Sequence, residues 1–336
     1  MAEPLGVLPC QSIEALAAAG AIAASTPLAP GQVQPASLDL RLASRCWRVR
    51  ASFLPGPGRK VAERLKAVAM HELDLERGAV LERGCVYIAE LQERLSLTPG
   101  VAGRANPKSS TGRLDIFVRL LTDGGPAFDD VAEGYNGPLY VEIAPQTFSV
   151  LARAGSRLNQ LRLKRGETRR TSVATIDVDL TGELAGYRAR RHAGVIDLDN
   201  EAGHDPHDFF EPLEPRRGEL LLDPGEFYIL ASKQAVEIPL DQFAEMTPID
   251  PAVGEFRAHY AGFFDPGFGL AEMGGAGSRA VLEVRSREAP FLLEDGQAVA
   301  RLVFEPMAER PTRAYGEGGS HYQSQGLKLS KHFRPW

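Results

Sequence analysis

The sequence predicts a mainly β protein built from two tandem copies of one β-barrel or jelly-roll module, with a short N-terminal helix. Three observations lead to this fold class. The 336 residues include 34 glycines and 24 prolines, so turn formers interrupt the chain at short intervals. Between the turns, apolar residues alternate over brief stretches, as they do in half-buried strands. The third observation is an internal repeat with a constant offset along the chain.

The repeat has an offset of 141 residues, the difference between Gly225 and Gly84. Three segments of the first half match three of the second at this offset: 84–97 with 225–238, 137–143 with 278–284, and 154–163 with 295–304. A fourth, weaker match relates 35–42 to 174–182. Because three blocks share one register, we expect a duplicated module.

The repeat divides the chain into module 1 (about 1–166), module 2 (about 168–312) and a C-terminal tail (313–336). Only 11–24, QSIEALAAAGAIAA, has a clear helical pattern. The segment 183–217 is rich in charge, proline and histidine, and we expect it to be an elaborated connection rather than part of a strand-rich core. Its histidines, His204 and His207, are expected to lie in a solvated loop.

Composition limits the classes of partner. The net charge of −6 argues against nucleic acid or an anionic membrane as the main partner, because phosphate-tracking surfaces are basic. The three cysteines are widely spaced and odd in number, which indicates neither a disulfide framework nor a paired-cysteine zinc site. The sequence shows no apolar run long enough for a membrane span and no signal-peptide pattern, so a cytoplasmic location is expected.

One short segment of module 1 has the chemistry of a phosphate site. Lys108-Ser109-Ser110-Thr-Gly-Arg113 places two hydroxyls, a glycine and a guanidinium within six residues. Hydroxyls and backbone N–H groups can donate to a phosphate, and an arginine can bind it with two parallel hydrogen bonds. Taken alone, the segment also fits a Ser/Gly turn with a solvated arginine.

The order of motifs around this segment resembles the dCTP deaminase/dUTPase superfamily. PASLDLRL precedes it, a glycine-rich hairpin and a strand with one carboxylate follow, and RLNQLRL closes the module. The resemblance implies that Lys108, Ser109, Ser110 and Arg113 bind phosphate. In module 2, HYAGFFDPGFG (259–269) resembles the family's nucleobase hairpin, and three of its residues match binding positions: Ala261, Asp265 and Phe268.

The C-terminal tail also resembles a family feature. In dCTP deaminases the C-terminal segment folds over the bound triphosphate, and the matching residues here are Tyr322, Gln325, Lys328 and Lys331. Residues 322–336 contain basic residues and no acid, as an anion clamp requires. The alternative is a frayed basic terminus.

The motif pattern predicts that each module retains half of a site. Module 2 has IDPAVG where module 1 has the serines and arginine, and the module 1 hairpin (122–137) lacks the FDPGFG pattern. Two carboxylates sit inside apolar strands at the repeat offset, Glu142 and Glu283, and both are candidate catalytic bases. Because sites in trimeric family members are shared between subunits, we expect the halves to meet between modules of a homo-oligomer with three-fold or pseudo-three-fold packing.

The resemblance implies hydrolytic deamination of dCTP to dUTP and ammonia, with a glutamate activating water. The zinc deaminase signature, H-x-E with P-C-x-x-C, is absent from the sequence, so no zinc is expected and Mg²⁺ is expected to arrive with the triphosphate. The alternatives are a dUTP diphosphatase, a bifunctional enzyme that carries out both steps, and a non-catalytic nucleotide-binding regulator.

Overall fold

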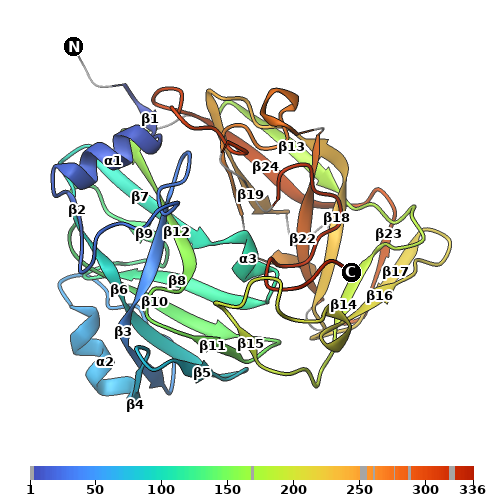
Figure 1. The fold of residues 1–336 in the computed structure, drawn as a ribbon, viewed down its shortest axis with the longest axis horizontal. Coiled ribbons are helices and arrows are strands. Elements are labelled where there is room, and N and C mark those ends of the chain that lie inside the picture. The colour runs from blue at the N-terminus through green and yellow to red at the C-terminus, as the bar shows by residue number, and fades with distance from the viewer. Residues whose placement is uncertain are drawn as a thin grey trace.

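Strands dominate the chain, as the density of turn residues predicts. The computed structural model describes residues 4–167, 170–249, 256–259, 262–275, 277–286, 289–317 and 322–336, with the backbone alone at 256–259. Figure 1 shows two β-rich lobes side by side, with the blue-to-green N-terminal half in one and the yellow-to-red C-terminal half in the other. The predicted mainly β class is confirmed.

Module 1 is organised around one large sheet. Its path is β8-β10-β6-β3-β12-β7-β9, with β1, β2 and β4 paired at its sides. The elements of this module are β1 (Gly6–Val7), α1 (Cys10–Ala18), β2 (Ile22–Ala24), β3 (Leu38–Val49), α2 (Val61–Val68), β4 (Ala69–Asp74), β5 (Ala79–Leu81), β6 (Val86–Ser96), β7 (Val101–Pro107), α3 (Ser109–Gly112), β8 (Ile116–Thr122), β9 (Asp130–Val131), β10 (Asn136–Pro145), β11 (Val150–Ala152) and β12 (Arg157–Arg165).

Module 2 repeats this arrangement in smaller sheets, ordered β16-β14-β18-β22-β20, β13-β24-β19-β21 and β17-β23. Its elements, with those of the preceding connection, are β13 (Ser172–Asp177), β14 (Gly186–Ala189), β15 (Ile196–Asp197), η1 (Pro206–Asp208), β16 (Phe210–Leu213), β17 (Glu219–Leu222), β18 (Tyr228–Val236), β19 (Gln242–Pro248), β20 (Phe256–His259), β21 (Phe263–Phe264), η3 (Ala271–Met273), β22 (Ser278–Ser286), β23 (Phe291–Glu294) and β24 (Ala298–Pro306).

The sequence repeat is also a structural repeat. The 141-residue offset carries β7 onto β19 and β12 onto β24, and the members of each pair start and end together. One side-chain hydrogen bond in the turn also recurs. The Tyr87 hydroxyl accepts from the Glu82 N–H at 2.9 Å, and the Tyr228 hydroxyl accepts from the Asp223 N–H at 2.8 Å. In both turns a glycine supplies the left-handed backbone that the hairpin needs, Gly84 with φ 74° and Gly225 with φ 75°.

The expectation for 183–217 was wrong. This segment forms β14, β15 and β16, and β14 lies between β16 and β18 inside a module 2 sheet. β15 instead pairs in parallel with β11 of module 1, so the segment ties the two modules together. Two buried aromatic residues lie among the frequent charges of this segment, Phe209 and Phe210, and they belong to a core cluster that contains residues of both modules.

The helix expected over 11–24 is shorter than its sequence pattern. α1 stops at Ala18, Gly20 takes a left-handed backbone, and the remaining apolar residues form β2, which pairs with β6. The amphipathic helix α2 was not predicted; it buries Val61 and Leu65. No helix in the part of the chain that the structure describes is long and apolar enough to cross a membrane.

Candidate functional site

In Figure 1, α3 of module 1 points toward the module 2 strands. A cleft of about 900 Å³ lies between the two modules. Both modules and the tail line it, and it gathers most of the residues that the sequence analysis singled out. Those residues are Lys108, Ser109, Ser110, Arg113, Asp265, Phe268, Glu283, Tyr322, Gln325 and Lys331. Ala261 lies outside the described residues.

Arg113 is held at the end of α3 by the C-terminal tail. Its guanidinium donates to the Lys328 carbonyl and to the Gln325 Oε1, each at 2.9 Å, and lies 4.0 Å from the centre of the Tyr322 ring. These contacts bury the guanidinium and fix its position in the wall of the cleft. An arginine fixed in this way loses little side-chain entropy when an anion binds.

Lys108 is paired with a carboxylate that the sequence analysis did not select. Its ammonium contacts Asp39 on β3, and Arg157 lies 3.7 Å from the same carboxylate. Asp39 is almost fully buried, and its Oδ1 has no hydrogen-bond partner among the described residues. The aspartate of PASLDLRL was the available sequence signal, because it is a charge within an apolar strand.

Glu283 lies on β22 in the wall of the cleft and is only 4% exposed. Burial raises the pKa of its carboxyl to about 8, the Arg113 charge opposes this shift, and the Asp115 charge adds to it. A carboxyl with a pKa near neutrality can both accept and donate a proton under physiological conditions.

Asp265 and Phe268 form another part of the wall. Burial raises the pKa of Asp265 to about 7, the nearby Asp39 charge adds to the shift, and its Oδ1 has no hydrogen-bond partner in the described part of the chain. Phe268 packs edge-to-face on Phe264, at 5.1 Å between ring centres, and lies 5.4 Å from Tyr315. An aromatic wall beside unsatisfied polar atoms suits a planar polar ligand such as a nucleobase with its sugar.

Glu142 does not line the cleft, so the structure does not support its candidacy as a base there. Its carboxylate accepts from the Arg119 Nε at 3.0 Å, and it is 1% exposed. The Arg119 guanidinium in turn stacks 3.6 Å from the Phe128 ring centre. A cation and an aromatic ring from module 1 therefore occupy the space beside this carboxylate.

Lys328 also differs from its expected role. Its ammonium is 5.7 Å from the Tyr322 ring centre rather than in the cleft wall, and its carbonyl is the group that holds Arg113. Burial and the Arg113 charge lower the pKa of its ammonium.

The tail is anchored beyond the cleft by residues of the 183–217 segment. The Ser330 hydroxyl donates to the Ser110 carbonyl at 2.8 Å, and Lys331 pairs with Glu201. Further along, the rings of Phe333 and Phe210 are 5.4 Å apart. Trp336 packs 4.6 Å from Tyr187 and 4.2 Å from His207. This aromatic anchor could not be predicted from local sequence, because the tail and the 183–217 segment that it packs against are more than a hundred residues apart.

The two halves of the predicted site come from one chain. We expected them to meet in a multimer, but the serines and arginine of module 1 already face Asp265 and Glu283 of module 2 across the intramolecular cleft. Module duplication explains this geometry, because a single chain supplies both neighbours that one interface needs.

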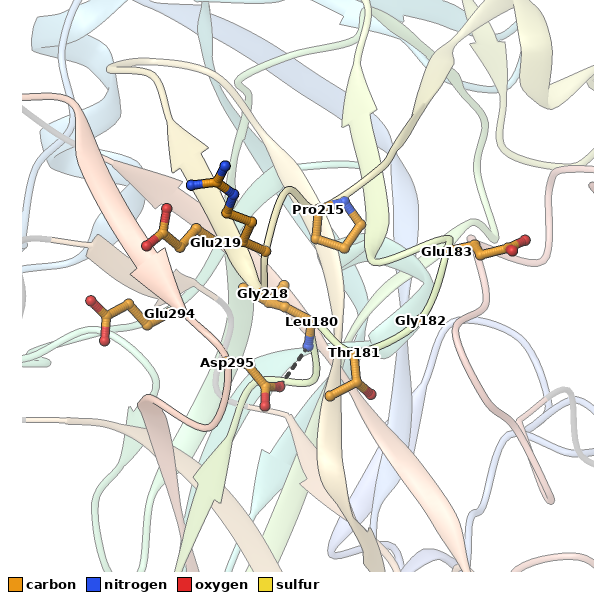
Figure 2. Close-up of a pocket in the computed structure, with 10 residues that line it drawn as sticks. Leu180, Thr181, Gly182, Glu183, Pro215, Gly218, Glu219, Glu294 and Asp295 are labelled. Carbon is orange, nitrogen blue, oxygen red and sulfur yellow. Dashed lines mark hydrogen bonds between the residues drawn. The ribbon is translucent and has the colours of Figure 1, made fainter.

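A second hollow, of about 760 Å³, lies at the outer end of module 2 (Figure 2). Glu183, Glu219, Glu294 and Asp295 line it together with Arg217, and the Asp295 carboxylate accepts from the Leu180 N–H at 3.0 Å. The carboxylates in this lining outnumber the guanidinium, which disfavours a polyphosphate. The cleft between the modules is therefore the candidate nucleotide site.

Fold and cleft together define a protein of two β modules with a composite, nucleotide-sized site. Models of the N-terminal and C-terminal domains of 2′-deoxycytidine 5′-triphosphate deaminase match residues 4–167 and 153–333. The chain therefore belongs to the dCTP deaminase family, and the predicted resemblance is confirmed.

Solved and curated relatives agree with this membership. A crystal structure of 2′-deoxycytidine 5′-triphosphate deaminase from Agrobacterium tumefaciens is 52% identical, with a TM-score of 0.87, over 90% of this chain and 99% of that one. The "dCTP deaminase, dUMP-forming" of Halobacterium salinarum is 32% identical over 112 residues, which span 32% of this chain and only about half (53%) of that relative. The enzyme of the same name from Methanothermobacter thermautotrophicus is 25% identical over 151 residues, 44% of this chain and 71% of the relative.

Proposed function

We propose that the chain removes the amino group from the cytosine of dCTP by hydrolysis and releases it as ammonia. Glu283 transfers the protons in this reaction. The observation that carries this proposal is a buried carboxyl with a pKa of about 8 in the same cleft as Arg113, which the tail holds in place. Family membership and the Agrobacterium tumefaciens structure support the substrate class.

The proposed reaction needs one proton acceptor that later acts as a donor. The Glu283 carboxylate takes a proton from water as the hydroxide adds to C4 of the cytosine, and Glu283 then passes this proton to N3. The remaining proton of the added hydroxyl group next passes through Glu283 to the amino group, which leaves as ammonia while the C4 carbonyl forms. Water enters, ammonia leaves and a uracil nucleotide remains, so Glu283 ends in its starting state.

The remaining cleft residues have binding roles in this proposal. Lys108, Ser109, Ser110 and Arg113 hold the phosphates, with Mg²⁺ entering on the triphosphate. Asp265 and Ala261 orient the nucleoside, and Phe268 lies beside the sugar, where it disfavours a 2′-hydroxyl. Tyr322, Gln325 and Lys331 close the cleft from the tail.

The proposal assigns water activation to Glu283 without zinc, because the sequence lacks the H-x-E and P-C-x-x-C signature of the zinc deaminases. A zinc chelator is therefore part of its test.

Two products are compatible with the cleft, and the names of the two curated relatives favour the second. The simple product is dUTP. The Halobacterium salinarum and Methanothermobacter thermautotrophicus proteins are named as dUMP-forming, which corresponds to the bifunctional alternative in which the triphosphate is also cleaved. We propose deamination as the common step. We propose dUTP as the released product, because the Agrobacterium tumefaciens protein, which matches 90% of this chain rather than 32% or 44%, is named as a 2′-deoxycytidine 5′-triphosphate deaminase without mention of dUMP.

The deciding experiment is product analysis of the purified protein with dCTP and Mg²⁺, with and without a zinc chelator. Ammonia with an equal amount of dUTP supports the proposal, whereas ammonia with dUMP and pyrophosphate assigns the bifunctional reaction. A parallel reaction supplied only with dUTP detects a diphosphatase. Tight dCTP binding without any product identifies a non-catalytic regulator, and activity that the chelator abolishes contradicts the metal-free mechanism.

A further inference from the structure

One buried ion pair joins the two modules next to the cleft. Arg285 of module 2 donates from Nε to the Asp115 carboxylate of module 1 at 3.0 Å, and its other nitrogens also bind this carboxylate and the Gly225 carbonyl. Thr147 of module 1 completes the cluster, because its hydroxyl donates to Asp115 at 2.5 Å and accepts from Arg285 at 2.7 Å. Asp115 is fully buried, and the Arg285 side chain is 18% exposed.

Each member of this ion pair is close in sequence to a cleft residue of its own module. Arg285 is two residues beyond Glu283 on β22, so both side chains leave the same face of the strand. Val281, two residues before Glu283, also lines the cleft, which identifies this face as the one toward module 1. Asp115 is likewise two residues beyond Arg113.

The backbone around Asp115 is held as firmly as its side chain. Its N–H donates to the Gly112 carbonyl at 2.8 Å, and its carbonyl accepts from the Gln146 N–H at 2.9 Å. It adopts a left-handed backbone with φ 55°, which is uncommon for a residue with a side chain. A conformation of this kind persists only where the surroundings determine it.

We propose that the Arg285–Asp115 pair is a positioning device that sets the placement of Glu283 relative to Arg113. The inference rests on the proposed function of the cleft. A short path runs from Arg113 through Asp115 and Arg285 to Glu283, and it crosses between the modules at this ion pair and at the adjoining Arg285–Thr147 hydrogen bond. Removing one partner of the ion pair leaves the other buried and uncompensated, so β22 and the turn between α3 and β8 separate or shift. A displacement of about 1 Å between a catalytic group and its substrate can cost about a hundredfold in rate.

The test compares Arg285→Gln and Asp115→Asn with the wild-type full-length chain. We expect kcat for dCTP to fall about 10- to 100-fold, with the Kd for dCTP changed less than about threefold, because Arg113 still meets the phosphates. The double variant should lose about as much as the worse single variant, since the two residues act as one unit. Arg285→Lys, which keeps the charge, should recover part of kcat.

Two control variants remove comparable interactions elsewhere. Arg188→Gln breaks the Arg188–Glu211 pair within module 2, at 2.7 Å. Glu245→Gln breaks the cross-module Arg162–Glu245 pair, at 3.1 Å. Both controls should retain kcat within about twofold even where they lower the melting temperature. Loss of kcat in these controls to the same degree, or unchanged kcat in folded Arg285→Gln, overturns the positioning role.

A readout that needs no catalysis separates this inference from the proposed function. Hydrogen exchange of the free proteins should rise in Arg285→Gln at 109–116 and 278–286 together, and not in Arg188→Gln. If the wild-type chain fails to deaminate dCTP, the proposed function fails, while a joint rise of exchange in both segments of Arg285→Gln still supports the positioning role of the Arg285–Asp115 pair. If exchange in both segments of Arg285→Gln matches that of the wild type, this positioning role is refuted whatever the activity.

Discussion

Glu142 and Glu283 occupy the same place on equivalent strands, and only Glu283 faces the cleft. Glu142 on β10 pairs with Ile88 of β6, and Glu283 on β22 pairs with Ile229 of β18, so both carboxylates and both partners are 141 residues apart. Their surroundings differ. Glu142 forms an ion pair with Arg119, whereas Glu283 forms no ion pair among the described residues and has a pKa raised to about 8. One duplicated position has thus become a structural ion pair and the other a candidate base.

The first prediction separates these two glutamates. Glu283→Gln should lower kcat for dCTP by at least about a thousandfold, because the amide keeps the shape but cannot accept a proton. The Kd for dCTP should remain within a few-fold. Glu142→Gln is the matched control, and deamination per folded molecule should stay near the wild-type value. The reverse pattern of losses would move the site into module 1.

The second prediction concerns Arg113. Arg113→Ala should weaken dCTP binding by roughly 1.5–3 kcal/mol, the scale of a charge-assisted hydrogen bond. Deoxycytidine, which has no phosphate, serves as the control ligand, and its affinity should change much less. Calorimetric titration with both ligands measures the difference. Equal losses for the two ligands indicate that Arg113 only supports the tail.

The third prediction concerns the aromatic anchor of the tail. Trp336→Ala removes the packing on Tyr187 and His207. Deletion of 322–336 removes the whole segment that we propose to close the cleft, here called the lid. We expect KM to rise and kcat to fall in both variants, more strongly in the deletion, since a closing segment both holds the ligand and excludes water. Limited proteolysis without nucleotide should cut the tail of Trp336→Ala faster than that of the wild type. Wild-type kinetics in the deletion would rule out a lid.

The fourth prediction is a pH dependence of stability. The Glu283 pKa of about 8 in the folded state lies above the value near 4.3 in an unfolded chain, so the folded state binds the proton more tightly. Stability from this group is present at low pH and is lost as the pH rises from about 4.5 to about 8. Glu283→Gln removes this loss, so its melting temperature relative to the wild type should increase between pH 5 and pH 8.5. A constant difference across this range would contradict the raised pKa.

The fifth prediction follows from the intramolecular cleft. Mixing an Arg113→Ala chain with a Glu283→Gln chain should restore no activity, because neither chain contains a complete cleft. Subunit exchange must first be demonstrated with differently tagged chains. Partial recovery would show that sites form between chains. The oligomeric state itself, expected to be three-fold or pseudo-three-fold, is measured separately by light scattering.

Much of the candidate site was predictable from local patterns. Arg113 and the serines beside it form a continuous motif, and Asp265 with Phe268 belongs to another. Asp115 and Arg285 could not be found in this way, because each is an ordinary charge in its own segment. Their significance depends on a contact between residues 170 positions apart along the chain.

By itself, the sequence determined the duplication and the strand-rich class, and it identified the segment proposed to bind phosphate and the two candidate glutamates. These features are carried by periodicity and by short motifs, which are local properties. The tertiary structure alone decided that both halves of the site meet within one chain, that 183–217 supplies strands and an aromatic anchor, and that Glu142 is neutralised by Arg119. Burial and pairing of charges depend on neighbours brought together by folding, so identical residues at equivalent strand positions can acquire different chemistry.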